Sequence, residues 1–500
     1  MLNRLSKFIS RKPIWGWLMF FVILTVVFLL GLLAASITER RAEIASVFNN
    51  RKVEIPELES RSEIWGVNYP REFETWKKTR NMDFKSKHNG NVRIDVLEDR
   101  PAMVVLWAGY AFAMEYEAAR GHGYAIDDIR NTLRTGSPTT PETNIQPNTC
   151  WTCKSPDVPR RMHETGIANF YSGKWSSLGD EIVNPIGCAD CHDPGTMSLT
   201  ITRPGLIEAF ERQEHDIKNA TAQEIRTLAC AQCHVEYYFK GEDKYLTFPW
   251  DKGTTVEQIE EYYDQAGHVD WIHKLSKAPM LKAQHPDYEI FIVGPHAKRG
   301  LSCADCHMPY KVDGGIKYSD HQITSPLKNI SSTCQTCHRD SEENLRQYVY
   351  EYQDKALEIR DRIETELAKA HITAKYAWDK GAGENQMKQA LQLIRQAQWR
   401  WDFVAASHGA TFHAPVESQR ILAHSLDRTL QAQLALQKVL FSLNVKENVP
   451  MPDISTKAKA QHYIGLDMKT LIEKKEAFKK DVIPGWIKTA KEKNRLVDRI

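Results

Sequence analysis

The sequence has no cysteine to spare and no excess of either charge. All ten cysteines fall into Cys-x-x-Cys pairs, so none is left for a structural disulfide or a catalytic thiol. The 66 basic residues are balanced by 64 acidic ones, which gives a net charge of +2 over 500 residues. A nucleic-acid-binding protein needs a concentrated basic face, and this composition does not indicate one.

Apolar runs of membrane-spanning length are lacking except near the N-terminus. There, 23 uncharged residues run from Ile14 to Ser36, enough to span a bilayer. The residues before them are basic and should stay in the cytoplasm, so the chain after Glu39 is exported. Residues 1–38 are therefore a cytoplasmic stub with a membrane anchor, or a long signal cleaved near Ala34-Ala35-Ser36. The protein is expected on the periplasmic side of the cytoplasmic membrane, anchored by residues 14–36 or released. The basic residues are Arg4, Lys7, Arg11 and Lys12.

Four of the five cysteine pairs are followed directly by histidine. Cys-x-x-Cys-His attaches haem c, because two thiols bond the porphyrin vinyl groups and the adjacent imidazole binds the iron. Zinc ribbons and thioredoxin-like sites also use Cys-x-x-Cys, but they need no histidine after the second cysteine. The four sites are Cys188, Cys191 and His192; Cys230, Cys233 and His234; Cys303, Cys306 and His307; and Cys334, Cys337 and His338.

The first pair, Cys150 and Cys153, is followed by Lys154 instead. In a row with four haem sites we interpret it as a fifth attachment site, with a zinc or dithiol site as the alternative. Lysine binds iron only as a neutral amine, and because its free pKa is near 10.4, burial and the charge of the iron must remove a proton. Two axial histidines fill both axial positions of a haem iron, whereas a catalytic haem needs one open axial position. The pattern predicts that the Lys154 iron is the catalytic one, unless this lysine points to solvent and another group binds the metal.

The segment that holds the motifs is rich in Gly and Pro, and the motif spacing is irregular. We predict a mainly α protein with a multihaem cytochrome c fold, in which short helices and long loops surround five haems. Residues 39–340 form the pentahaem catalytic domain, with a buried helix over 101–119. Residues 341–500 form a long-helix region, capped at Ser341, that packs on the haem domain or forms a subunit interface. The expected long helices cover residues 341–370, 385–407 and 416–443.

Six longer motifs complete the pattern. They are Arg-Gly-His-Gly-Tyr-Ala at 120–125, Leu-Arg-Thr-Gly at 133–136, Cys-Trp-Thr-Cys-Lys-Ser-Pro-Asp at 150–157, Cys-His-Val-Glu-Tyr-Tyr at 233–238, Lys-Ala-Gln-His-Pro at 282–286 and Phe-His-Ala-Pro at 412–415. With the lysine site and the export signal, they resemble pentahaem cytochrome c nitrite reductase, the ammonia-forming enzyme. The resemblance implies six-electron reduction of nitrite to ammonium at the Lys154 haem.

The resemblance also implies the residues around the substrate. Arg134, Tyr237 and His285 would surround nitrite on the open face of the Lys154 haem. An arginine suits an anion, a histidine can deliver protons near neutral pH, and a phenol can donate a hydrogen bond. One calcium ion would lie beside this haem, held by oxygen ligands of the kind that calcium prefers. These ligands are the side chains of Glu236 and Gln284 and the backbone carbonyls of Tyr237 and Lys282.

Distal iron ligands are implied for the four histidine sites as well. His321 would close the Cys188/Cys191 haem, His122 the Cys230/Cys233 haem, His413 the Cys303/Cys306 haem and His296 the Cys334/Cys337 haem. His408 lies close to His413 in the sequence and is its rival.

The implied partners are a quinol-oxidising multihaem cytochrome as electron donor and a second copy of the chain in a homodimer. Two other functions are compatible with the haem motifs alone. A multihaem electron conduit would have every iron closed by two protein ligands. A sulfite-reducing or hydroxylamine-oxidising relative would carry more haems or a different catalytic motif.

Overall fold

The computed structural model describes residues 13–497, except residues 50, 89, 141–142 and 144–145. The chain divides into two compact units, Met1–Glu54 and Ile55–Ile500. The basic residues predicted to flank the apolar run on its cytoplasmic side lie outside the described residues.

The first unit contains one long helix, α2, Pro13–Asn49. From Pro13 to Arg41 it is long and apolar enough to cross a membrane, and none of its most apolar stretch is buried. A helix that is apolar all round has no stripe to turn toward a protein core. This agrees with the predicted anchor or signal, since both have this composition.

The second unit is mainly helical, and its helices before residue 340 are short, as predicted. They are α3 Ser62–Asn68, α4 Pro70–Lys77, α5 Val96–Asp99, α6 Ala102–Leu106, α7 Ala125–Asn131, α8 Asp157–Thr165, α9 Ile167–Ser172, α10 Cys188–Cys191, α11 Pro204–Arg212, α12 Ala222–Ala231, α13 Val256–Gln265, α14 Asp287–Ile292 and α15 Cys303–His307. Loops and 3-10 turns connect them.

The strands of the second unit form three separate two-stranded antiparallel ladders. In the described part of the chain no larger sheet occurs, so helices and loops carry the fold. The ladders pair β1 Tyr238–Lys240 with β2 Tyr245–Thr247, β3 Trp271–Ile272 with β4 Pro279–Met280, and β5 Tyr310–Asp313 with β6 Ile316–Ser319. Tyr238 lies opposite Thr247, Trp271 opposite Met280 and Tyr310 opposite Ser319.

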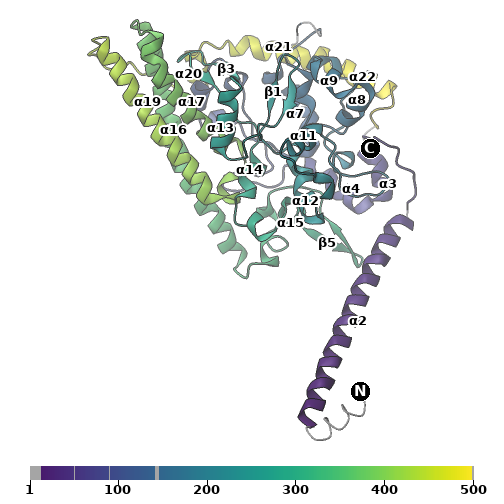
Figure 1. Ribbon diagram of the computed structural model, residues 1–500. Coiled ribbons are helices and arrows are strands. Elements are labelled where there is room, and N and C mark those ends of the chain that lie inside the picture. Colours follow the sequence, from purple (N-terminus) through teal and green to yellow (C-terminus); the bar gives the residue numbers. More distant parts are fainter. Residues whose placement is uncertain (1–12, 50, 89, 141–142, 144–145, 498–500) are drawn as a thin grey trace. The chain divides into compact units, whose positions relative to one another are not determined.

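Three long helices lie side by side along one edge of the second unit (Figure 1). They are α16 Glu342–Asp379, α17 Glu384–Ala406 and α19 Pro415–Ser442, and all three predicted long helices are thereby confirmed. The Ser341 hydroxyl accepts a hydrogen bond from the Asn344 amide at 3.2 Å, so the predicted N-cap is confirmed too. The remaining helices are α18 Ala410–His413, α20 Lys457–Tyr463, α21 Met468–Asp481 and α22 Ile483–Glu492.

The prediction of one buried helix over residues 101–119 is wrong in its extent. Only α6 is helical there, followed by a 3-10 turn at Ala111–Ala113. Between them Gly109 has φ +91°, which ends the helix, and its backbone approaches that of Lys274. The burial was predicted correctly, since residues 103–108 are fully buried.

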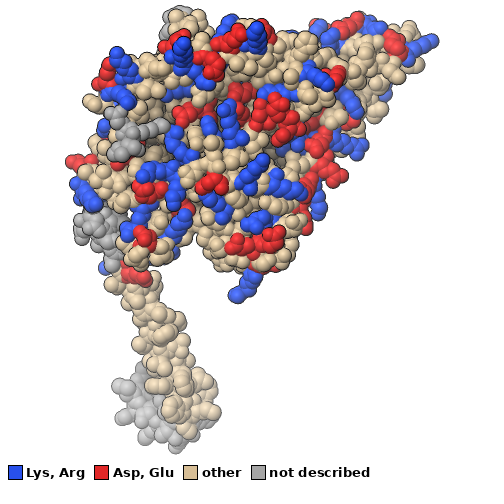
Figure 2. Space-filling view, turned by 180° about the vertical axis from the view of Figure 1, so that it is seen from behind, with Lys and Arg blue, Asp and Glu red and all other residues tan. Residues whose placement is uncertain are grey.

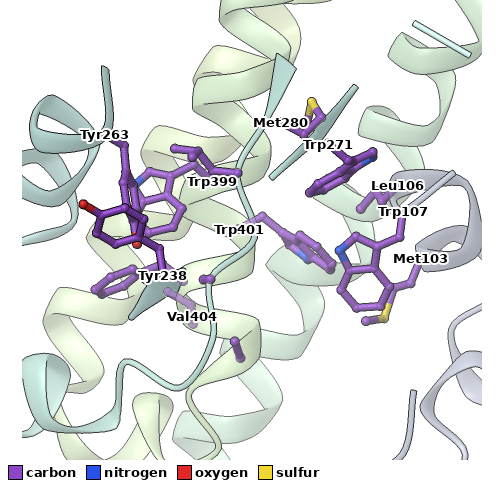
Figure 3. Packing of buried hydrophobic residues seen from close by; sticks show 14 of the residues in the cluster. Met103, Leu106, Trp107, Tyr238, Tyr263, Trp271, Met280, Trp399, Trp401 and Val404 are labelled. Atoms are coloured by element: carbon purple, nitrogen blue, oxygen red, sulfur yellow. The ribbon is translucent and has the colours of Figure 1, made fainter. Parts of the chain in front are cut away.

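The core joins the long helices to the loops that precede them. Trp401 of α17 packs on Trp107, with ring centroids 5.6 Å apart, and Trp399 packs on Tyr263 of α13 at 5.5 Å (Figure 3). Both α17 tryptophans also donate buried hydrogen bonds, Trp401 to Glu364 and Trp399 to the Val256 carbonyl. Replacing either tryptophan by alanine would remove about 3–5 kcal/mol of stability.

The surface carries both charges in alternation. On the face shown in Figure 2, basic and acidic side chains are interspersed over the second unit, with no broad area of one sign.

Candidate functional site

A cavity of about 2050 Å³ lies in the second unit. Its walls carry all ten cysteines, Lys154 and the four histidines that follow the other pairs. Pockets for one small ligand are typically about 300–1,000 Å³, so this cavity suits several large ligands. The cysteines form no disulfide. Sequence motifs spread over about 190 residues are thus gathered around one enclosed space, as covalently attached haems require.

Each attachment motif forms a short turn that places both cysteines on one side, three residues apart. The lysine motif turns more tightly than the histidine motifs, because the Lys154 amide donates to the Trp151 carbonyl, three residues back, at 2.9 Å. In three histidine motifs the histidine amide donates to the first cysteine, four residues back. These bonds join His192 to Cys188 (3.0 Å), His234 to Cys230 (2.9 Å) and His338 to Cys334 (2.9 Å).

The aspartates inside the two Cys-Ala-Asp-Cys motifs cap their own turns. Asp190 accepts a hydrogen bond from the Gly187 amide at 2.8 Å, and Asp305 accepts one from the Ser302 amide at 2.7 Å. A carboxylate at this third position satisfies a backbone donor that the helix leaves free. The sequence between the cysteines therefore stabilises the attachment turn itself.

Arg203 fixes the backbone around Lys154. Its side chain is 1% exposed and donates to the carbonyls of Thr152 at 2.6 Å and Ser155 at 2.8 Å. It also forms a buried ion pair with Asp190 in the next attachment turn. The lysine loop and the Cys188/Cys191 loop are thus held together by one guanidinium, which presents planar donors in a fixed geometry.

The attachment sites are also joined to one another. The Arg203 amide donates to the Gln232 side chain at 3.2 Å, between Cys230 and Cys233, while its Nε donates to the Thr152 carbonyl of the lysine loop. Helix α12, which carries Cys230, packs against α15, which carries Cys303. The Cys230/Cys233 site therefore lies between the lysine site and the Cys303/Cys306 site.

Each histidine that follows a cysteine pair faces the distal histidine implied by the family resemblance. The pairs are drawn from distant segments, and each pair has nearly the same separation of ring centroids. The separations are 6.2 Å for His192 and His321, 6.2 Å for His122 and His234, 6.3 Å for His307 and His413, and 6.3 Å for His296 and His338.

This separation fits a metal ion between the two rings. A metal–imidazole bond is about 2.0 Å, and each ring adds about 1.1 Å from nitrogen to centroid, so two rings on one ion are about 6.2 Å apart. Burial also favours the neutral form of several of these rings, the form in which an imidazole binds a metal. Burial lowers the pKa of His122 to about 3 and the pKa values of His192 and His413 to about 4. The residues therefore fit haem irons with two axial histidines.

His285 and His408 form a fifth pair in the cavity, with ring centroids 6.2 Å apart. Neither follows a cysteine pair, so separation alone does not make them iron ligands. Burial lowers the pKa of His285 well below its usual value. Of the two rivals in the sequence, the structure places His413 opposite His307 and places His408 behind His285.

The other predicted substrate residues line the same cavity. Arg134 lies in the 3-10 turn Leu133–Thr135, where its Nε donates to the Thr132 hydroxyl at 3.2 Å. Its guanidinium lies over the Phe112 ring at 4.4 Å, which helps to fix it. Tyr237 stacks on Phe239 with centroids 5.9 Å apart, and burial raises the pKa of its phenol well above the usual value, so the phenol keeps its proton.

The predicted calcium ligands also lie close together. Glu236 is fully buried and accepts hydrogen bonds from the Gln284 amide at 2.6 Å and the Tyr263 hydroxyl at 2.9 Å. Burial raises the pKa of Glu236 well above its usual value, a penalty that a bound cation would remove. The side-chain amide of Gln284 lies 3.3 Å from the Lys282 carbonyl. In the described part of the chain, no cluster of three or more His, Cys, Asp or Glu side chains is arranged to hold a metal, and this set relies on amide and carbonyl oxygens instead.

Two residues in this region, Asp402 and Asp287, were missed by the sequence analysis, and His408 was considered there only as a rival of His413. Asp402 of α17 forms a buried ion pair with Lys282 at 2.8 Å. Asp287 lies beside His234, and His408 lies behind His285. Only Asp287 could have been noticed in the sequence, because it directly follows the Lys-Ala-Gln-His-Pro motif at 282–286.

This mainly helical fold, with five Cys-x-x-Cys turns around one cavity and paired histidines across it, defines a multihaem c-type cytochrome. The chain belongs to the cytochrome c552 family, whose pattern it matches over residues 61–494. The resemblance noted in the sequence is thereby confirmed at the level of the family.

Similar proteins cover nearly the whole chain. It is 63% identical to cytochrome c-552 of Parabacteroides distasonis and 63% identical to cytochrome c-552 of Bacteroides thetaiotaomicron, with 97% of this chain and 98% of each relative aligned. A solved cytochrome c nitrite reductase from Desulfovibrio desulfuricans is 31% identical, with a TM-score of 0.75, over 84% of this chain and 91% of that one. That structure is a catalytic subunit with two calcium sites.

Proposed function

We propose that this chain is an exported pentahaem cytochrome c nitrite reductase, which reduces nitrite to ammonium at the haem attached to Cys150 and Cys153. One contrast carries the proposal. Four attachment sites have a second histidine across the cavity, whereas the fifth has Lys154, with Arg134, Tyr237 and His285 in the same cavity.

Lys154 would hold the iron of this haem from one side. A haem iron with an open axial position can bind a small anion and pass electrons to it. The tight turn at Lys154 and the two carbonyls held by Arg203 restrict where the amine can lie. That rigidity favours one ligand geometry over a solvent-facing lysine.

Arg134 would bind the nitrite anion, and Tyr237 and His285 would supply it with hydrogen bonds and protons. The guanidinium is fixed by its contacts with Thr132 and Phe112, and its planar donors suit an anion. Converting nitrite to ammonium consumes eight protons with six electrons, so proton delivery is essential. The buried phenol of Tyr237 keeps its proton as a hydrogen-bond donor, and His285 would pass protons inward from His408.

A calcium ion held by Glu236, Gln284 and the carbonyls of Tyr237 and Lys282 would keep two substrate residues in place. Tyr237 follows Glu236 directly, and His285 follows Gln284 directly. A cation at this position fixes both backbones at once. The calcium sites of the Desulfovibrio enzyme support this part of the proposal.

The C-terminal region, residues 341–500, would form a homodimer interface. Helix α19 exposes three large apolar side chains to solvent, Val416 (82% exposed), Leu434 (64%) and Phe441 (83%). Exposed apolar side chains that form a contiguous patch mark interaction sites, and positions 434 and 441, seven residues apart, lie on the same face of the helix. Replacing Leu434 by glutamate should shift the protein from dimer to monomer in analytical ultracentrifugation, and an unchanged dimer would contradict this assignment.

The remaining partners follow from the proposed export. Residues 39–340 would hold the haems on the periplasmic side of the cytoplasmic membrane, with α2 as an anchor or a cleaved signal. Electrons would come from a quinol-oxidising multihaem cytochrome.

The decisive experiment supplies nitrite, hydroxylamine or sulfite to the purified protein with a reduced dye and measures ammonium and sulfide. We expect ammonium from nitrite, and a loss of more than about 100-fold in Lys154→Leu with the four histidine-ligated haems intact. Lys240→Leu, at an exposed position on β1, is the matched control and should keep full activity. A wild-type protein that passes electrons but produces no ammonium would identify an electron conduit instead.

A further inference from the structure

The histidine of the Cys230/Cys233 site has a neighbour that the other attachment sites lack. Oδ2 of Asp287 lies 3.5 Å from Nδ1 of His234, the ring nitrogen that remains when Nε2 binds iron. At two other attachment sites this nitrogen contacts a backbone carbonyl instead. These contacts join His192 to Met197 at 2.9 Å and His307 to Thr324 at 3.1 Å.

Asp287 is held in this position from several sides. Its side chain is 16% exposed, and its Oδ1 accepts a hydrogen bond from the Ser407 hydroxyl at 2.7 Å. The amide of Tyr288 donates to the His234 carbonyl at 3.1 Å, which joins the two backbones. The contact between the carboxylate and the imidazole is therefore built into the fold, at the start of α14.

A carboxylate and a carbonyl act differently on an imidazole that binds iron. The carboxylate attracts the Nδ1 proton more strongly, which makes the ring a better electron donor to the metal. A more basic axial ligand stabilises the oxidised iron and lowers the reduction potential. Because His192 and His307 contact neutral carbonyls, the haem at His234 should differ from theirs.

The reduction potential of this haem matters because of where its attachment site lies. Arg203 joins this site to the lysine loop, because its amide donates to the Gln232 side chain at 3.2 Å and its Nε donates to the Thr152 carbonyl at 2.6 Å. On the other side α12, which carries Cys230, packs against α15, which carries Cys303. Electrons that travel from the Cys303 site toward the lysine site would pass through the haem between them. A low potential there makes the final step toward the Lys154 iron favourable.

We propose that Asp287 is a positioning residue that orients His234 and lowers the reduction potential of the haem at Cys230 and Cys233. This rests on the proposed function in one respect, the ligation of that haem by His234. Asp287 lies outside the sequence motifs described above, and its effect would act through the imidazole and not on the substrate.

The test is a spectropotentiometric titration of the haem-loaded protein, followed by electron paramagnetic resonance. Asp287→Asn keeps the shape but offers a neutral carbonyl, so one low-spin haem should become easier to reduce. We expect at least a tenfold change in its reduction equilibrium, about 59 mV for one electron, with a changed low-spin signal for that haem alone. Ser407→Ala frees the carboxylate of a competing donor, so the same haem should shift in the opposite direction.

The matched control is Asp354→Asn, which removes a carboxylate from His88, a histidine that follows no cysteine pair. No haem should shift in this variant. Unchanged potentials in Asp287→Asn, or shifts of the same sign in the Asp287 and Ser407 variants, would overturn the proposal. If Asp287→Asn fails to incorporate five haems, the sign of the Ser407→Ala shift decides. Ammonium production is measured separately, so an inactive wild type with the expected shifts would refute only the nitrite reductase proposal.

Discussion

A buried ion pair holds the segment that carries His285, and breaking it should be costly. Lys282 and Asp402 are each 1% exposed, with Nζ 2.8 Å from Oδ1. The other oxygen of Asp402 accepts from the Ala283 amide at 3.0 Å, so the pair ties α17 to residues 282–285. Asp402→Asn leaves the shape nearly unchanged but removes the only negative charge that contacts this ammonium among the described residues.

The expected loss can be worked from these contacts. Removing one partner of a buried pair usually costs about 3–5 kcal/mol, because the other charge stays buried and uncompensated. Lys282 also lies over the rings of Phe112 at 4.9 Å and Trp107 at 5.3 Å. Such cation–π contacts stabilise the unpaired ammonium by about 0.5–2 kcal/mol. We therefore expect the free energy of unfolding to fall by about 2–4 kcal/mol.

Guanidinium unfolding of the haem-loaded protein, followed by circular dichroism, measures this loss. The matched control is the exposed pair Lys375 and Asp379, 2.5 Å apart, where Asp379→Asn should cost less than about 0.5 kcal/mol. The double variant Lys282→Met with Asp402→Leu should recover most of the stability, since no charge is left buried. A loss in Asp402→Asn no larger than in the control would refute the reasoning.

Three further changes test other parts of the structure. Burial lowers the pKa of Lys475 to about 7 in the folded chain, so the unfolded chain binds more protons between pH 7 and 10.5. The stability of wild type relative to Lys475→Met should therefore rise with pH across that window. A stability difference that stays flat with pH would show that the shift is absent. His122→Ala removes the ring facing His234 and should add one high-spin haem signal in electron paramagnetic resonance, whereas an unchanged spectrum would mean that His122 binds no iron. Glu236→Gln should lower kcat/KM about 10–100-fold and abolish the loss of activity caused by a calcium chelator, with the haem content unchanged; a variant still sensitive to the chelator would place the ion elsewhere.

Local chemistry was predictable from the sequence. The five attachment turns need only residues within five positions of each other, and the capping Asp190 and Asp305 lie inside those same turns. The long helices after Ser341 were predictable as well, because helical periodicity and an N-cap are local signals. The extent of the helix expected over 101–119 was not, because Gly109 ends it where its backbone meets that of Lys274.

The sequence by itself determined the cofactor class, the number of Cys-x-x-Cys motifs and the one lysine that follows such a motif, since these features depend on adjacent residues. The family resemblance implied which histidines face each other, but only the tertiary structure showed that His413 and not His408 lies opposite His307, and that Asp287 and Asp402 contact residues of the site. Such contacts join distant positions, for example Lys282 and Asp402, which are 120 residues apart. No local pattern encodes such pairings, because they depend on how the whole chain packs around the cavity.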